Sequence, residues 1–249
     1  METLSFHHLR KKFGGTAALS DVSLSFTNEG TVALIGPNGA GKTTLLNIIS
    51  GFLAPDSGQV FLGATEITGM APYRIAKLGI VRTFQELRII RNLSTLDNVM
   101  LSRPEQLGEN LLHALLRLRS KQGEIDNRQT AFQLLEIVGL EEKSIDPAGS
   151  LSYGQQKLLA LACCLATEAH TLILDEPVAG VHPDMIDKII SLLGKLKEQG
   201  KRLLFIEHDL NMVRKTADFV VVMANGVVIA QGPPDDVLAQ PEILEAYLR

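Results

Sequence analysis

The feature that most constrains the fold is a glycine-rich segment lying between an apolar run and a helical pattern. The run 31–35 predicts a strand, residues 45–49 predict a helix, and the segment between them reads Gly36-Pro37-Asn38-Gly39-Ala40-Gly41-Lys42-Thr43-Thr44. Glycines let backbone N–H groups turn toward a polyphosphate with no Cβ in the way, and the helix start adds free amides. A chance glycine-rich turn would lack this flanking strand and helix. The segment therefore predicts a P-loop that binds a nucleoside triphosphate.

Two side chains at the end of the P-loop are expected to meet the phosphates. Lys42 is expected to reach the β- and γ-phosphate oxygens, and the Thr43 hydroxyl is expected to ligate Mg²⁺.

Length, charge and cysteine content narrow the class of protein. The 249 residues suit one domain or a core with a sizeable insertion, and the net charge of -4 with a pI of about 5.9 gives no sign of a nucleic-acid surface. No apolar run approaches the ~20 residues that span a bilayer, and Met1–His8 does not resemble a signal peptide. Cys163 and Cys164 are adjacent, so we expect free thiols on a core helix in a reducing cytosol.

Alternating patterns predict short strands in the first third of the chain. Leu4, Phe6 and His8 alternate with polar residues, and so do Val22, Leu24 and Phe26. Further expected elements are strands at 60–62 and 80–84 and a helix at 72–78, the last strand leading to Gln85.

The pattern changes to purely helical from about residue 93. Helices are expected at 105–119 and 125–138, separated by a break at Lys121-Gln122-Gly123. No strand signal occurs between about 90 and 167, which predicts an all-helical insertion.

Strand and helix patterns then alternate to the end of the chain. Strands are expected at 171–174 and 203–206, helices at 183–198 and 209–216, and a hairpin through Asn225-Gly226 between 219–223 and 227–230. Two short helices, 235–239 and 242–248, complete an α/β fold with a helical insertion.

Asp175 and Glu176 directly follow the apolar strand 171–174. Ligands of open α/β sheets bind at the carboxyl ends of parallel strands, so Asp175 is placed to hold Mg²⁺ and Glu176 to polarise an attacking water. Taken alone, two acidic residues after a strand are more often helix caps.

The stretch Leu151–Gln156 opens an apolar helix and has two interpretations. Ser152 with a glutamine three residues later is an ordinary capping box, and it is also a second anion site that could meet a γ-phosphate. The residues alone leave both open.

Taken together, these motifs resemble those of ATP-binding cassette (ABC) ATPases, in order and along essentially the whole chain. The resemblance implies a P-loop NTPase (RecA-like) core with an N-terminal antiparallel β subdomain and an inserted all-helical subdomain. It places the α/β core at 1–88 and 168–249 and the helical insertion, with the Leu151–Gln155 signature, at 89–167. The motifs that carry it are Gly36–Thr44, Gln85, Leu151–Gln155, Asp175-Glu176 and His208.

The resemblance also implies residue roles. Glu176 matches the catalytic base, and Gln85 matches the link from Mg²⁺ and water to a membrane subunit. His208 matches the γ-phosphate contact, although a single histidine at a strand end is usually structural. Residues of the signature contact ATP bound to the opposite subunit, namely Ser152, Gly154 and Gln155. Phe13 matches the aromatic that stacks on adenine, although a phenylalanine beside a turn also suits a core. Tyr153, and Val178–Pro183, depart from the commonest family pattern.

Finer similarities suggest a subgroup. Residues 82–85, 92–99 and the tail from Pro241 resemble importers of branched-chain amino acids and related amides or urea. The runner-up is the ATPase of a lipopolysaccharide exporter, which has a similar tail. The implied partners are a second ATPase subunit, membrane subunits docking near Gln85, and indirectly a solute-binding protein, at the cytoplasmic face of a bacterial-type inner membrane. Five apolar residues are candidates for that docking surface, although core packing would explain several of them equally well: Leu87, Ile89, Ile90, Leu93 and Leu96.

Two other classes fit less well. Cassette ATPases acting on nucleic acid usually carry two cassettes or long coiled coils, and neither occurs here. A P-loop GTPase would need an Asn/Thr-Lys-x-Asp motif, which the sequence lacks.

Overall fold

The fold is described from a computed structural model that covers residues 2–26, 30–83, 89–104, 121–241 and 243. These residues form two compact units. Unit 1 comprises Met1–Arg82, His170–Ala179 and Leu193–Arg249, and unit 2 comprises Thr83–Ala169 and Gly180–Leu192. Gln85 and the helix expected at 105–119 lie outside the described residues, as does nearly all of the helix expected at 242–248.

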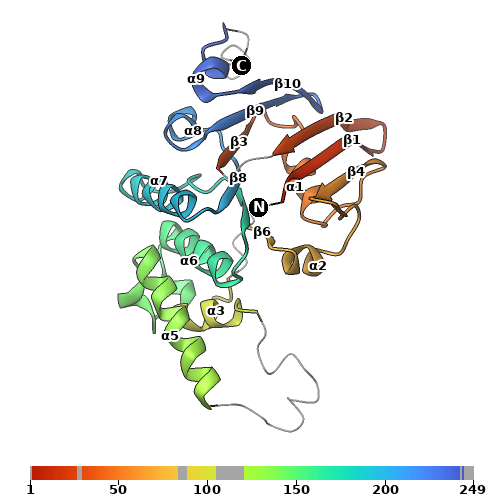
Figure 1. The fold of residues 1–249 in the computed structure, drawn as a ribbon. Helices are drawn as coiled ribbons and strands as arrows, with labels where there is room; N and C mark the ends of the chain where they lie inside the picture. Colours follow the sequence, from red (N-terminus) through yellow and green to blue (C-terminus); the bar gives the residue numbers. More distant parts are fainter. Residues whose placement is uncertain (1, 27–29, 84–88, 105–120, 242, 244–249) are drawn as a thin grey trace. The chain divides into compact units, whose positions relative to one another are not determined.

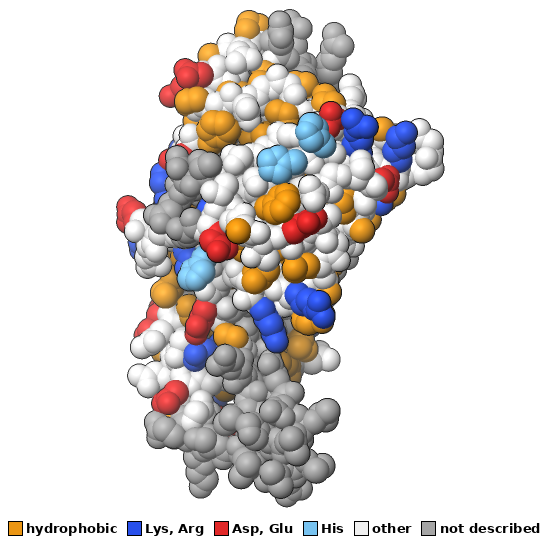
Figure 2. Space-filling view, turned by 45° about the vertical axis from the view of Figure 1, so that its right-hand side comes forward, with side chains coloured by type: hydrophobic (Ala, Val, Ile, Leu, Met, Phe, Trp, Pro, Cys, Tyr) orange, Lys and Arg blue, Asp and Glu red, His pale blue; other side chains and the backbone are white. Residues whose placement is uncertain are grey.

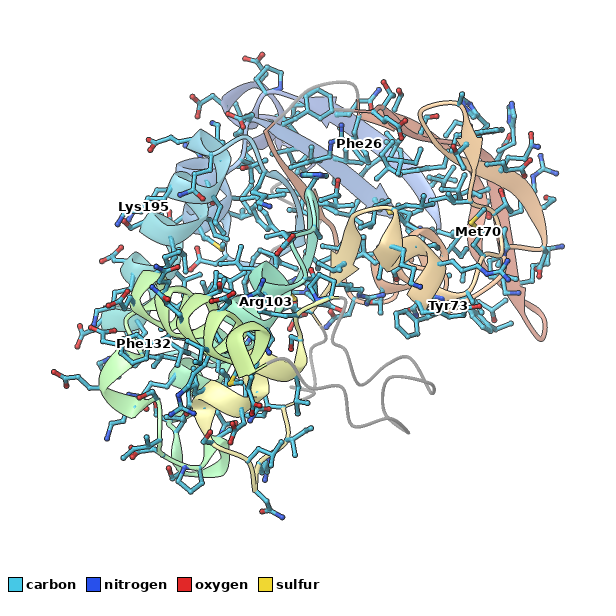
Figure 3. All side chains as sticks on the ribbon, turned by 60° about the horizontal axis from the view of Figure 1, so that its bottom comes forward. Phe26, Met70, Tyr73, Arg103, Phe132 and Lys195 are labelled. Carbon is cyan, nitrogen blue, oxygen red and sulfur yellow. The ribbon has the colours of Figure 1, made fainter. Side chains whose placement is uncertain are left out.

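An antiparallel sheet begins unit 1 (Figure 1). Its strand order is β2-β1-β4-β5, built from β1 (Leu4–Phe13), β2 (Thr16–Phe26), β4 (Ser57–Leu62) and β5 (Thr65–Glu66). Phe6 and Phe26 pack edge to face in its core with ring centroids 5.6 Å apart, and Figure 3 labels Phe26.

One detail of β1 differs from the predicted alternation. Leu4 and Phe6 are buried, but His8 is exposed and Leu9 is buried instead. The pairing register shifts between Phe6 and Leu9, and His8 has a φ of 53°. A bulge at His8 therefore moves the inward-facing set by one residue.

The second sheet of unit 1 is parallel except for one edge strand. Its order is β10-β9-β3-β8-β7-β6, from β3 (Thr31–Ile35), β6 (Ile80–Arg82), β7 (Thr171–Asp175), β8 (Arg202–Ile206), β9 (Phe219–Ala224) and the antiparallel β10 (Val227–Gly232). All residues of β7 and β8 are buried, as expected for central parallel strands. The β9–β10 hairpin turns at Asn225 and Gly226, both with positive φ, as predicted.

Helices of unit 1 complete this α/β layer. They are α1 (Lys42–Ile49), α2 (Pro72–Lys77), α8 (Leu210–Thr216) and α9 (Pro234–Leu238). The apolar side chains of α1 share one core with both sheets, so the helix that follows the glycine-rich segment is held from two sides.

Unit 2 is helical in its described residues. It contains α3 (Thr95–Leu101), α5 (Lys121–Val138), α6 (Tyr153–Ala166) and the first part of α7 (Pro183–Glu198), with short 3-10 turns at Glu141–Lys143 and Ala148–Ser150. The helix break predicted at Lys121–Gly123 is wrong, because α5 includes all three residues. A helical glycine costs only about 1 kcal/mol, and packing of α5 against α3 and α6 offsets that cost.

No helix among the described residues is both long and apolar enough to cross a bilayer. On the face shown in Figure 2, Lys and Arg side chains of the described residues are interspersed with Asp and Glu and do not form one continuous basic band.

Candidate functional site

Residues 36–41 join β3 to α1, and Lys42–Thr44 form the first turn of that helix, in the strand–turn–helix order that the sequence predicted. Gly41 is the N-cap of α1, and no side chain caps the helix there. The first N–H groups of α1, and the positive end of its dipole, are therefore suited to an anion.

Gly36 and Gly41 are glycines because of close backbone approach. A Cβ on Gly36 would lie 2.0 Å from the carbonyl oxygen of Met223, and one on Gly41 would lie 2.4 Å from that of Ala18. Gly39 has a positive φ of 79°, but nothing lies within 4 Å of its Cβ position. The two ends of the loop thus pack against the backbone of Met223 and Ala18, and its tip at Gly39 is open.

Lys42 folds back over the loop that precedes it. Its Nζ donates hydrogen bonds to the carbonyl oxygens of Gly36, at 2.6 Å, and Pro37, at 2.9 Å. Burial lowers the pKa of Lys42, and the charges of Glu176 and Asp175 oppose that decrease. Two backbone carbonyl oxygens therefore hold the ammonium group against the loop.

Asp175 ends the buried strand β7 and forms a buried ion pair that the sequence analysis did not predict. Its Oδ2 accepts a hydrogen bond from Arg82 Nη2 at 2.7 Å, with side chains only 6% and 2% exposed. Nη1 of Arg82 donates to Asn47 Oδ1 on α1, at 2.7 Å. Arg82 therefore ties the carboxylate to the helix that begins at the P-loop. The signal for it was an arginine within an otherwise apolar strand, Ile80-Val81-Arg82.

Glu176, the next residue, adopts a backbone conformation that is uncommon for non-glycine residues. Its φ is 50°, and its N–H donates to the carbonyl oxygen of Ile206 at 3.1 Å. Its Oε1 lies 3.3 Å from Nε2 of His208, which follows the neighbouring strand β8. Strained backbone of this kind concentrates at functional sites.

Glu207 is a second residue that the sequence analysis missed. It is 2% exposed, and its two carboxylate oxygens accept hydrogen bonds from the backbone N–H groups of Val178, at 2.9 Å, and His208, at 3.2 Å. The available sequence signal was a glutamate placed directly between an apolar strand and a histidine.

Ser152, in unit 2, is the N-cap of α6. Its Oγ accepts from Gln155 N at 3.3 Å, and Gln155 Oε1 accepts from Ser152 N at 2.9 Å, which forms the predicted reciprocal capping box. Ser152 is exposed and Gln155 is partly buried. Gly154 is buried, and a Cβ there would lie 3.2 Å from Val181, so close packing accounts for this glycine.

The two departures from the commonest family pattern meet in unit 2. The ring of Tyr153 lies over Gly180, whose Cβ would be 3.2 Å from Tyr153 Cε1, and Lys157 Nζ lies 5.4 Å from the ring centroid. The bulky residue at 153 is therefore accommodated by a glycine in the second unusual stretch.

Phe13, at the end of β1, is 53% exposed and is not a core residue. Lys11 Nζ lies 5.9 Å from its ring centroid, so an aromatic face stands in solvent beside a cation.

The oxygen donors here fit Mg²⁺ that arrives with phosphate. Thr43, an exposed residue in the first turn of α1, offers a hydroxyl, and Asp175 offers a carboxylate. The described residues contain no group of three His, Cys, Asp or Glu side chains able to hold a metal by themselves. Mg²⁺ in phosphate-transfer sites needs only one or two protein ligands, so the donor set suits a shared ion.

Comparison with known sequences gives full-length relatives. The family described as ABC transporter matches residues 19–179. The probable branched-chain amino acid transport ATP-binding protein LivG of Archaeoglobus fulgidus is 39% identical over 248 residues, which cover 100% of this chain and 96% of the relative. The high-affinity branched-chain amino acid transport ATP-binding protein BraF of Pseudomonas aeruginosa is 37% identical, covering 96% of this chain and 95% of the relative.

Solved structures agree with this match. A crystal structure of the ADP conformation of an ATP-binding cassette of an ABC transporter superimposes with a TM-score of 0.85 at 34% identity, covering 100% of this chain and 99% of that one. A dimeric post-hydrolysis cassette bound to ADP and Pi has a TM-score of 0.78 at 26% identity, covering 93% and 98%. The predicted fold class is confirmed.

Proposed function

Because the chain belongs to the ABC transporter family, we propose that it is the ATP-hydrolysing subunit of an importer for branched-chain amino acids or related amides or urea. The observation that carries the solute class is that full-length relatives at 35–39% identity are named as branched-chain amino acid transport proteins. The lipopolysaccharide-exporter ATPase remains the alternative, supported by the similar tail sequence.

The phosphates of ATP would bind to the open tip of the Gly36–Thr44 loop and the start of α1. Lys42 would exchange its two loop carbonyls for phosphate oxygens, while Phe13 would stack on adenine through its exposed ring. Thr43 and Asp175, together with Gln85, would hold Mg²⁺, which neutralises phosphate charge.

Glu176 would polarise the water that attacks the γ-phosphate, and His208 would steady that carboxylate while contacting the phosphate. The 3.3 Å separation of their side chains supports this division of roles. Preorganised groups of this kind lower the barrier because they need no rearrangement during the reaction.

The working unit is proposed to be a pair, either two copies of this chain or this chain and a paralogue. ATP held by one P-loop would meet the signature of the other subunit, namely Ser152, Gly154 and Gln155. The exposed position of Ser152 at the start of α6 supports this. Once the capping box opens, the backbone N–H groups there can donate hydrogen bonds to an anion. Closing on ATP and reopening after hydrolysis would then follow from contacts that exist only in the closed state.

Membrane subunits are proposed to dock near Gln85 and the helical insertion, 89–167, on the cytoplasmic side of the membrane. Of the candidate docking residues, Ile90 is 51% exposed and Ile89 and Leu93 are partly buried. Leu96 is only 3% exposed, so it belongs to the core of unit 2 and is withdrawn from this surface. Leu87 lies outside the described residues.

The test is a reconstitution with the native membrane subunits, measuring which solute stimulates ATP hydrolysis. Glu176→Gln should abolish turnover but leave a pair that ATP locks together, whereas Lys42→Ala should weaken nucleotide capture. Stimulation by branched-chain amino acids, amides or urea is the expected result. Normal turnover by Glu176→Gln would remove that residue from the role of base, and stimulation by lipid alone would favour the exporter.

A further inference from the structure

We propose that Glu207 is a positioning residue for ATP hydrolysis, which sets the spacing between Glu176 and His208. This inference rests on the proposed function, because it requires Glu176 and His208 to take part in ATP hydrolysis. Glu207 follows β8 directly, and it is buried to 2% exposure in unit 1.

The Glu207 carboxylate holds two backbone N–H groups. One oxygen, Oε1, accepts from the N–H of Val178, two residues after Glu176, and the other, Oε2, accepts from the N–H of His208. A single side chain therefore connects the turn that follows β7 with the backbone of the histidine that follows β8. Val178 is itself only 4% exposed, so water is a poor substitute for this bond.

The turn that follows β7 is strained at Glu176. Glu176 has a φ of 50°, and the turn closes through Ala179 N donating to Glu176 O at 3.3 Å. A non-glycine residue keeps such a conformation only when its surroundings restrain it. The restraints are the Glu176 N–H bond to Ile206 O on one side and the Val178–Glu207 bond on the other.

Both hydrogen bonds require an acceptor oxygen, and glutamate at position 207 supplies two. A carboxylate presents two acceptor oxygens, whereas a carboxamide presents one acceptor and two donors. In Glu207→Gln, whichever way the amide is turned, its NH₂ group faces a backbone N–H. One of the two bonds is then lost with almost no change in size, so the variant loosens either the Glu176 turn or His208.

Expected behaviour follows from this geometry. Glu207→Gln should lower kcat by about tenfold or more, because small displacements of a catalytic group are costly. The two backbone groups that Glu207 holds, on Val178 and His208, lie outside the P-loop, so nucleotide affinity should stay within about twofold of wild type. A merely structural role would instead lower the folded fraction and leave the kcat of folded protein unchanged.

The experiment measures kcat, KM, binding of a fluorescent ATP analogue and thermal unfolding for four proteins in complex with their membrane subunits: wild type, Glu207→Gln, His208→Ala and the double variant. The exposed Glu66→Gln is the matched control for the same chemical change. If Glu207 acts through the Glu176–His208 pair, the kcat of the double variant should lie within about twofold of the kcat of His208→Ala. The two changes would then damage the same unit, so their effects do not multiply.

Wild-type kcat in Glu207→Gln overturns the proposal, and so does a double variant whose loss is the full product of the two single losses. Failure of the proposed function looks different: wild type then hydrolyses no ATP, or Glu176→Gln turns over normally.

Discussion

Nε2 of His208 lies 3.3 Å from Oε1 of Glu176, at the adjacent carboxyl ends of the parallel strands β8 and β7. The two residues are 32 positions apart in the sequence, yet both lie at the same edge of the parallel sheet. The pair brings an imidazole to the carboxylate proposed to polarise water, so its loss is a direct test of the site.

His208→Ala should lower the rate of ATP hydrolysis by about 10²-fold, because the carboxylate loses its neighbour and the γ-phosphate loses a contact. Steady-state ATPase measurements check this. The matched control is His8→Asn, which removes the imidazole from another histidine–carboxylate pair, with Asp21 at 2.8 Å, on the antiparallel sheet. Asparagine tolerates the positive φ of His8, so this control should hydrolyse ATP normally. An equal loss in both variants would contradict the assignment.

Arg82→Met should destabilise the fold by about 3–5 kcal/mol, because it leaves the Asp175 carboxylate buried without its ion partner. Denaturant unfolding followed by circular dichroism measures the change. The double variant Arg82→Met with Asp175→Asn should recover part of the loss, since the buried carboxylate charge that had paired with Arg82 is then absent. A single variant within about 0.5 kcal/mol of wild type would show that the ion pair is not a net stabiliser.

Gly36→Ala should abolish nucleotide binding or soluble expression, because its Cβ would lie 2.0 Å from the backbone oxygen of Met223. Gly39→Ala is the matched comparison within the same loop. Both positions have positive φ, but nothing lies within 4 Å of the Gly39 Cβ position, so that variant bears backbone strain alone, about 1–2 kcal/mol. Binding of a fluorescent ATP analogue ranks the two. Equal effects would mean that strain, rather than the clash with β9, is decisive.

Cys163 and Cys164 should resist thiol reagents in the folded protein at pH 8. Burial raises the pKa of Cys163 to about 11, and burial together with the neighbouring thiol raises that of Cys164 to about 12. Only the thiolate reacts, and it is scarce at that pH in the folded state. Release of a chromophore from a disulfide reagent should be slow in native protein and rapid in guanidinium chloride. Fast labelling of native protein would contradict the raised pKa values of both thiols.

Much of the fold was predictable because its signals are local. The bounds of α7 match the predicted helix 183–198, and the largely apolar runs at 171–174 and 203–206 became the central strands β7 and β8. The Asn225-Gly226 turn was equally clear, because few residue pairs tolerate two consecutive positive φ values.

Errors arose where packing overrode a local preference. Alternation predicted His8 on the buried face, but a bulge places Leu9 there, since pairing with β2 and β4 decides the phase of β1. Gly123 was taken as a helix break, yet α5 continues through it because its neighbours in unit 2 stabilise it. Leu96 was one of five candidates for a docking surface, with core packing as the alternative, and it lies in the core of the same unit.

The residue patterns alone determined the nucleotide-binding loop, the carboxylates Asp175 and Glu176 after a buried strand, and the alternation that makes an α/β sheet, because each is encoded within a few neighbouring residues. Tertiary structure decided which distant groups meet. Arg82 reaches Asp175 across 93 positions, and Glu207 reaches Val178 across 29. Such contacts depend on the order of strands in the sheet, which forms only when the separate segments bury their apolar faces together.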